Sequence, residues 1–411
     1  MKKVTYFGLL LAVALTGLSS CSSSDDVTSD PTNTKSGESR LTLTISTPVA
    51  KTSSAKGNSF AMGSRATDIT TDPTATKEQV INHITVGIFS SDGKTVRTIQ
   101  ELSSGSGGVG TYTQASNSAE ATATIVTNSL VAGDSILVAC NAPAGTFHGV
   151  QTAAQFRAKT ESIDNSLATT FGGQVGAKLV DNNIPMFGKA TLSKNTNDDN
   201  FSASVNVNHQ TAKVTLTSLT VDFDQNGAYK DASFTPTQIF LMNVPENLKF
   251  DTDASTGTST LFQGYDNSTA STYKEYLSTS AISTTALSGV ASASTAKFGS
   301  TYYFYTMPNH KTDKDVRTKL VIAGIFKSSA SDTQGTTVYY PVPLNANYDN
   351  GKAAAVDGTA FAVYANKNYQ CTVTIKTKGA ANPTDDVTPQ QATITVTVQP
   401  FATAPQNTVF E

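Results

Sequence analysis

From residue 81 onward, short apolar runs alternate with clusters of Gly, Asn, Asp and Ser. Residues 84–89 (ITVGIF) form one such run, and Ser90-Ser91-Asp92-Gly93 follows it directly. An Asp-Gly pair between two apolar runs is a strong hairpin signal. The pattern therefore predicts β-strands joined by tight turns, with a hairpin at Asp92-Gly93.

Strand-like patterns recur along the rest of the chain, whereas only one short Ala-rich segment, residues 152–159, is typical of a helix. Many short strands with little helix indicate an all-β protein built from sandwiches and not a parallel α/β sheet. We place a domain boundary near Asn208, after the polar loop 194–200 and the strand that follows it. The further predicted strands span residues 121–126, 135–139, 202–207, 212–221, 238–243, 301–306, 319–326, 337–342, 369–376 and 392–399.

Two segments at opposite ends of the chain alternate between apolar and polar residues without a break. They are residues 41–46 (LTLTIS) and 392–398 (ATITVTV), and an apolar tail follows the second almost to the terminus. Period-two alternation places every second side chain on one face of a strand. The apolar faces carry Leu41, Leu43 and Ile45 in the first segment and Ile394, Val396 and Val398 in the second.

The first 21 residues predict export. Lys2 and Lys3 precede an apolar run, residues 4–18, that has the length of a signal peptide and is short for a membrane span. The run ends in Leu18-Ser19-Ser20-Cys21, which resembles a bacterial lipobox whose cysteine accepts the lipid. A Ser/Asp/Thr-rich tract up to about residue 40 reads as a tether, so lipid on Cys21 would be the anchor.

Composition argues against several classes of function. Lys and Arg (29) nearly balance Asp and Glu (32), so the net charge of -3 offers no case for nucleic acid. Tryptophan is absent, and the motifs of zinc proteases and serine hydrolases do not occur. We therefore expect no enzyme, no cofactor and no metal site. The four histidines are scattered along the chain, at His83, His148, His209 and His310.

Two features leave alternatives open. Asp222-Phe223-Asp224-Gln225-Asn226-Gly227 matches the first half of a calcium loop, but Ser233 stands where a bidentate Glu is needed, which favours an Asn-Gly turn. Cys140 and Cys371 each lie in an apolar strand-like run, which favours two buried free thiols over a disulfide.

A series of short motifs follows one another along nearly the whole chain. They are the lipobox, the strand at 41–46, an arginine site at Ser64-Arg65-Ala66-Thr67, residues 78–86, Asn141-Ala142-Pro143, residues 183–188 (NIPMFG), residues 368–375, Asn382-Pro383 and residues 393–398. In this order the motifs resemble those of the fimbrillin family, the major fimbrial subunits of Bacteroidales that build type V pili. Two positions depart from the family pattern: Phe401 stands where we would expect Trp, and Ile184 where Leu is commoner.

The resemblance implies two tandem Greek-key (transthyretin-like) β-sandwich domains and assembly by strand exchange. An outer-membrane lipoprotein precursor would be cut between Arg65 and Ala66 by an arginine-specific protease and would lose the strand at 41–46. The C-terminal strand of another subunit would then fill the groove by β-augmentation, giving a head-to-tail cell-surface fimbrium for adhesion to host or bacterial receptors. The implied segments are a signal peptide (1–21), a propeptide (22–65), an N-terminal domain (66–208) and a C-terminal domain (209–411).

Two other interpretations compete with this one. Arg65 on its own is equally typical of an ordinary exposed loop residue. A surface glycan-binding lipoprotein would share the export signal, the tether and the sandwiches, and the 14 tyrosines keep that alternative open although Trp is absent.

Overall fold

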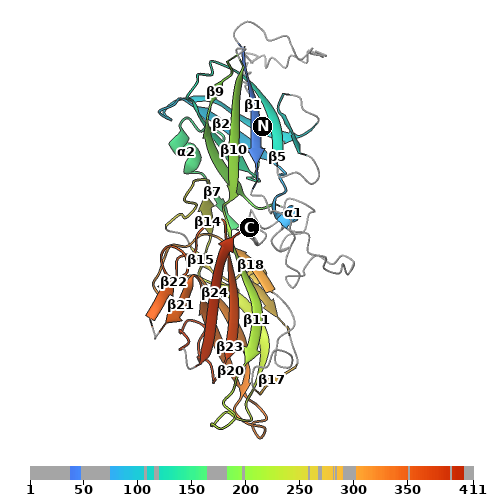
Figure 1. The fold of residues 1–411 in the computed structure, drawn as a ribbon, viewed down its shortest axis with the longest axis vertical. Helices are drawn as coiled ribbons and strands as arrows, with labels where there is room; N and C mark the ends of the chain where they lie inside the picture. The colour runs from blue at the N-terminus through green and yellow to red at the C-terminus, as the bar shows by residue number, and fades with distance from the viewer. Residues whose placement is uncertain are drawn as a thin grey trace, which may run out of the picture. The chain divides into compact units, whose positions relative to one another are not determined.

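The computed structural model describes residues 38–47, 75–105, 109–114, 120–163, 183–196, 200–257, 260–266, 271–280, 282, 285–289, 302–349, 352–388 and 391–401. Strands dominate these residues (Figure 1), which confirms the predicted all-β class. The described helices are a single turn or little more: α1 (Ala75–Glu78), α2 (Ala153–Arg157) and the 3-10 helix η1 (Glu275–Leu277). None of the helices in this described part is long and apolar enough to cross a membrane.

Nine strands of the N-terminal half belong to one sheet: β1 (Glu38–Ser46), β2 (Ile84–Phe89), β3 (Val96–Ser104), β4 (Thr111–Gln114), β5 (Glu120–Asn128), β6 (Ser135–Cys140), β8 (Met186–Thr191), β9 (Ser193–Lys194) and β10 (Phe201–His209). Their order is β1-β5-β4-β3-β2-β6-β8-β10-β9, and β10 also pairs with β1. The sheet therefore closes on itself through the β1–β10 pair. A simple two-sheet sandwich is thus an incomplete description of this half, because β1 joins what would otherwise be two free edges.

The C-terminal half contains two larger sheets, formed by β11 (Ala212–Val221), β12 (Ser233–Met242), β16 (Ser278–Ser280), β17 (Leu287–Ser288), β18 (Tyr302–Thr306), β19 (Lys319–Lys327), β20 (Thr336–Pro343), β23 (Lys367–Ile375) and β24 (Ala392–Pro400). One sheet has the order β18-β11-β23-β24, and the other has β16-β12-β19-β20 with β17 beside β12. Three two-stranded ribbons pair β13 (Val244–Pro245) with β15 (Leu261–Phe262), β14 (Asn247–Lys249) with β7 (Thr160–Ser162), and β21 (Ala346–Asp349) with β22 (Lys352–Ala355).

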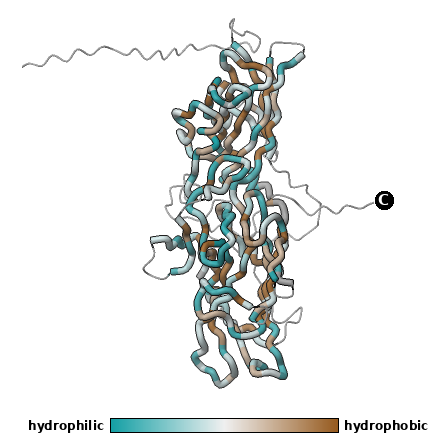
Figure 2. The backbone as a smooth tube through the Cα atoms, turned by 90° about the vertical axis from the view of Figure 1, so that its left-hand side faces the viewer, coloured by the Kyte–Doolittle hydropathy of each residue, from teal (hydrophilic) through white to brown (hydrophobic). Residues whose placement is uncertain are grey.

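Apolar side chains from alternate strand positions fill two main cores. Val214 of β11 and Ile322 of β19 are both fully buried in one cluster, so the two C-terminal sheets share a core. A separate cluster fills the closed N-terminal sheet and includes Val86 of β2 and Val138 of β6. Figure 2 shows hydrophobic and hydrophilic residues interspersed along the backbone of both halves.

The predicted hairpin is confirmed. β2 and β3 are antiparallel neighbours, and Asp92 Oδ1 accepts hydrogen bonds from Ser90 Oγ at 2.6 Å and Lys94 N at 3.0 Å. Gly93 has φ of 72°, a left-handed conformation that glycine adopts without a steric penalty. The predicted helix is confirmed as α2, whose cap is the Thr152 hydroxyl that accepts from Gln155 N.

Sheet membership changes between β10, which ends at His209, and β11, which begins at Ala212. This change lies close to the predicted domain boundary near Asn208, which stays a prediction. Cys140 in β6 and Cys371 in β23 are both buried and free. Burial raises the pKa of the Cys371 thiol to about 12 and also raises the pKa of Cys140, so both thiols stay protonated and unreactive at neutral pH.

Candidate assembly site

Strand β1 occupies a slot between two strands that come much later in the chain. It runs antiparallel to β5 along its whole length and parallel to β10 over residues 41–46. The backbone of β1 therefore has ladder partners on both sides. Without it, β5 and β10 would both present unpaired backbone groups, and unpaired strand edges recruit further strands.

The apolar face of β1 is completely buried. Leu41, Leu43 and Ile45 are each 0% exposed, whereas Thr42 between them is exposed. The predicted period-two alternation is thus confirmed in the structure. Full burial of three such side chains contributes roughly 5 to 9 kcal/mol as an upper bound.

The residues beside β1 in the ladder differ in size along the slot. At the middle position, Leu43 has an alanine on each side, Ala123 of β5 and Ala203 of β10. Small neighbours leave room for a branched side chain in the centre of the slot. The full flanking sets are Ile125 and Phe201 for Leu41, Ala123 and Ala203 for Leu43, and Ala121 and Val205 for Ile45.

The C-terminal strand β24 has a ladder partner on one side only among the described strands. It pairs with β23 and ends the order of its sheet. Val396 is buried (1% exposed), and Ile394 and Val398 are partly buried and pack against the C-terminal core. In this chain the predicted donor residues therefore lie in its own sheet, and the structure does not bring them to β1.

The outer edge of β24 is held by the side chain of Asn347. Asn347 Nδ2 donates to Val396 O at 3.0 Å, and Val396 N donates to Asn347 Oδ1 at 2.7 Å. The amide imitates one rung of a β-ladder, because it offers one donor and one acceptor to the same residue. No local sequence signal pointed to this residue, since its partner is far along the chain.

Phe401 directly follows β24 and is buried (4% exposed). Its ring stacks on Tyr305 at 5.6 Å between centroids and lies 4.3 Å from the ring of His209. The Phe401 N–H also donates to Asn366 O. These contacts anchor the end of β24 beside the β10–β11 connection.

A buried polar network adjoins Phe401 and reaches back to α1. Glu78 Oε1 accepts hydrogen bonds from Lys213 Nζ at 2.9 Å and from Tyr305 Oη at 2.5 Å, and all three side chains are buried. His209 Nε2 lies 2.8 Å from Glu78 O, and burial lowers the pKa of His209 to about 4. The histidine is therefore neutral at physiological pH and donates to the Glu78 carbonyl.

The other predicted site residues lie outside the described residues. These are Cys21, Arg65 and Ala66. In the Asp222–Gly227 segment, Asp224 Oδ1 accepts from Asn226 N at 2.9 Å, which is the geometry of a turn. No group of three or more His, Cys, Asp or Glu side chains is placed to hold a metal ion within the described ranges.

Residues 55–218 match the family model of the major fimbrial subunit protein (FimA). This part of the chain is similar to the FimA fimbrial subunits. The matched residues include β5 and β10, the two strands that flank β1. The family model describes a major fimbrial subunit protein.

Solved structures share the fold of this chain. A fimbrilin from Porphyromonas gingivalis has a TM-score of 0.55 at 15% identity, covering 89% of this chain and 99% of that chain. A candidate cell adhesion protein from Bacteroides eggerthii has a TM-score of 0.56 at 19% identity, covering 90% of this chain and 98% of that chain. A search of curated proteins found no match.

Proposed function

We propose that the chain is exported as an outer-membrane lipoprotein precursor acylated at Cys21 and cleaved between Arg65 and Ala66. Cleavage separates β1 from the rest of the chain, because Arg65 lies between β1 and α1 in sequence. β1 then leaves its slot, and the C-terminal strand of another subunit enters it. The result is an adhesive fimbrium built by donor-strand exchange.

One observation carries this proposal. β1 is an intact strand with a fully buried apolar face, and its only covalent connection to the sheet that it completes passes through the Arg65 segment.

The exchange is favourable on structural grounds. In its own sheet, β24 has a described ladder partner only in β23, whereas the emptied slot offers both β5 and β10. A donor therefore gains a second ladder, and each net backbone hydrogen bond is worth about 1 kcal/mol. Ile394, Val396 and Val398 have the same period-two spacing as Leu41, Leu43 and Ile45.

The proposed contact between a donor strand and the slot of the next subunit can repeat from one subunit to another. The donor strand and the slot belong to different sheets, so one subunit can give a strand and receive another at the same time. A head-to-tail interface of this kind produces a filament unless rotation closes it into a ring. The finer topology that we propose, two Greek-key sandwich domains at 66–208 and 209–411, is supported by the change of sheet between β10 and β11.

The test is limited digestion of the full precursor with an arginine-specific protease, followed by intact mass and size measurement. We expect a cut after Arg65, loss of β1 and a ladder of stable multimers. Arg65→Gln should leave the same preparation monomeric, and Arg157→Gln on α2 is a matched control that should still polymerise. A clean cut after Arg65 that yields only monomers would show that strand exchange is not the mode of assembly.

A further inference from the structure

Strands β1 and β24 carry the same residue pattern. Residues 41–46 are LTLTIS, and residues 394–399 are ITVTVQ. Branched aliphatic residues occupy the first, third and fifth positions of both segments, and threonine occupies the second and fourth. The two strands also have the same length, nine residues each. The likeness therefore goes beyond a shared period of two, and it offers a way to align one strand with the other.

The outer face of the slot carries hydroxyl side chains. Thr42 is exposed and Thr44 is half-buried, and Thr395 and Thr397 are exposed in β24. The ladder neighbours are Thr124 and Ser202 for Thr42, and Thr122 and Ser204 for Thr44. Threonine and serine side chains on neighbouring strands stabilise a sheet by hydrogen bonds. A donor with threonines at the same two positions keeps this face of the slot intact.

Pro400 limits how far a donor strand can shift along the slot. Proline has no backbone N–H, so it is found at the ends and edges of sheets. The ladders of β1 with β5 and with β10 both end at Ser46. When Ile394 takes the position of Leu41, Pro400 falls at position 47, one residue beyond both ladders. A shift that placed Val396 at the Leu41 position would bring Pro400 to position 45, inside both ladders.

The opposite shift leaves the slot underfilled. It places Ala392 at the position of Leu41, whose side chain is fully buried beside Ile125 and Phe201. An alanine there leaves a cavity, which destabilises a packed core. A shift by a single residue would turn the threonines inward. Among these alignments, only that of Ile394 with Leu41 keeps a branched aliphatic side chain at all three buried positions.

The two ladders of the slot also favour one direction of entry. β1 pairs antiparallel with β5 over residues 38–46 and parallel with β10 over residues 41–46. A donor that runs as β1 does keeps the longer pairing antiparallel, which is the more stable arrangement per residue. A reversed donor centred on Val396 would bring Pro400 to position 39, inside the ladder with β5.

We propose that the donor strand enters the slot in a single register, with residue 394 at position 41, in the same direction as β1. This inference rests on the proposed strand exchange and specifies how its partner, a second copy of this chain, is recognised. In this register Thr395 of one subunit lies opposite Thr124 of the next, and Thr397 lies opposite Thr122. The aliphatic and threonine pattern and the position of Pro400 together determine the register.

Disulfide trapping between subunits tests the register. Precursors with Thr397→Cys and precursors with Thr122→Cys are mixed, cut together with an arginine-specific protease and oxidised. We expect a disulfide between subunits, and likewise for Thr395→Cys mixed with Thr124→Cys. The crossed mixtures, 397 with 124 and 395 with 122, should give none. Diagonal neighbours across a sheet lie about 7 to 8 Å apart, whereas a disulfide needs Cα atoms within about 7 Å.

The native cysteines do not interfere with this test. Cys140 and Cys371 are buried, and Cys21 precedes the proposed cut after Arg65, so processed subunits offer only the introduced thiol. Thr44→Cys with Thr122→Cys in one uncut precursor is the reference, because these residues are ladder neighbours and should form a disulfide within the chain.

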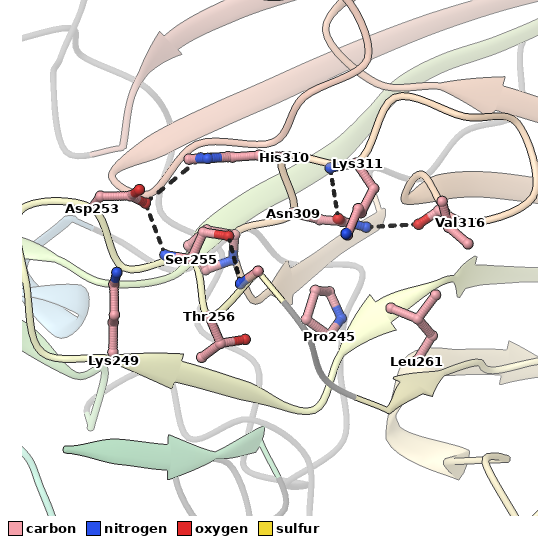
Figure 3. Close-up of a pocket in the computed structure, with 12 residues that line it drawn as sticks. Pro245, Lys249, Asp253, Ser255, Thr256, Leu261, Asn309, His310, Lys311 and Val316 are labelled. Carbon is pink, nitrogen blue, oxygen red and sulfur yellow. Dashed lines mark hydrogen bonds and ion pairs between the residues drawn. The ribbon is translucent and has the colours of Figure 1, made fainter. Parts of the chain in front are cut away.

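Lys311→Cys in place of Thr122→Cys is the control for random contacts. Lys311 is an exposed residue on the wall of the pocket formed by residues 245–261 and 308–316 (Figure 3). None of the described residues that line this pocket belongs to β5, β10 or β24. Mixed with Thr397→Cys, Lys311→Cys should give no disulfide between subunits.

The outcomes separate the register from strand exchange itself. Disulfides in the crossed mixtures would show a reversed or shifted donor and would overturn the register. Multimers without any of these disulfides, or equal yields with Lys311→Cys and Thr122→Cys, would also overturn it while leaving assembly intact. Absence of multimers after a complete cut at Arg65 would overturn the proposed strand exchange and the register with it.

Discussion

Asn347 holds Val396 at the outer edge of β24 through two hydrogen bonds, from Nδ2 to Val396 O at 3.0 Å and from Val396 N to Oδ1 at 2.7 Å. A side chain thus takes the place of a neighbouring strand. An edge capped in this way is protected in the monomer, and these two hydrogen bonds must break, together with the β23 ladder, before the strand can leave.

We predict that Asn347→Ala loosens β24. Two net hydrogen bonds of about 1 kcal/mol each are lost, so amide exchange of residues 393–398 should become roughly tenfold faster or more. Assembly after protease treatment should also start sooner. Asn226→Ala, at an exposed turn, is the control and should change neither rate. If amide hydrogen exchange in β24 is unchanged in Asn347→Ala, the Asn347 side chain does not help to hold β24 in its sheet.

Leu43→Ala should destabilise the precursor and leave the processed subunit unaffected. A fully buried Leu replaced by Ala costs about 2 to 5 kcal/mol of unfolding free energy, and the flanking Ala123 and Ala203 offer little to fill the space. Thr42→Ala on the exposed face should stay within about 0.5 kcal/mol of the native precursor. Denaturant unfolding before and after protease treatment measures the stability of the precursor and of the processed subunit for each variant. A difference between Leu43→Ala and native chains that persists after cleavage would mean that β1 does not leave.

Glu161 should make stability depend on pH. It is buried in β7, neither carboxylate oxygen has a hydrogen-bond partner among the described residues, and burial raises its pKa well above the usual carboxyl range. The folded chain keeps a proton that the unfolded chain releases, so stability is full below the unfolded pKa and declines as pH rises toward the folded one. Glu161→Gln should remove this decline.

Urea unfolding between about pH 4 and pH 8 checks the Glu161 prediction. The advantage of Glu161→Gln over the native chain should grow with pH, while the exposed Glu275→Gln should follow the native chain throughout. Parallel pH profiles for native and Glu161→Gln chains would contradict the assignment of a buried neutral carboxyl.

Removing only one of the two charges of the Glu78–Lys213 pair should lower the free energy of unfolding. Glu78→Gln leaves the Lys213 ammonium buried without its carboxylate, which typically costs about 3 to 5 kcal/mol. The double change Glu78→Leu with Lys213→Met removes both charges and should recover most of the loss. Thermal unfolding of the single and double variants measures this. A double variant no more stable than Glu78→Gln would show that separating the Lys213 ammonium from the Glu78 carboxylate is not the cause of the loss.

Local pattern in the sequence was sufficient for the strands and their turns. Period-two alternation placed Leu41, Leu43 and Ile45 on one face, and the Asp92-Gly93 pair marked a hairpin that the structure confirms. These features depend on residues close in sequence, because side-chain direction in a strand and the conformation of a tight turn are set within a few residues.

Tertiary structure alone decided which strands become neighbours. The parallel pairing of β1 with β10 joins residues 41–46 to residues 201–206, and no local pattern encodes a contact over that separation. The same holds for the Asn347 amide on Val396 and for Glu78 beside Lys213 and Tyr305. Each depends on how sheets pack and close, so the alternation identified a strand with one buried face, whereas the fold decided the slot that this strand fills.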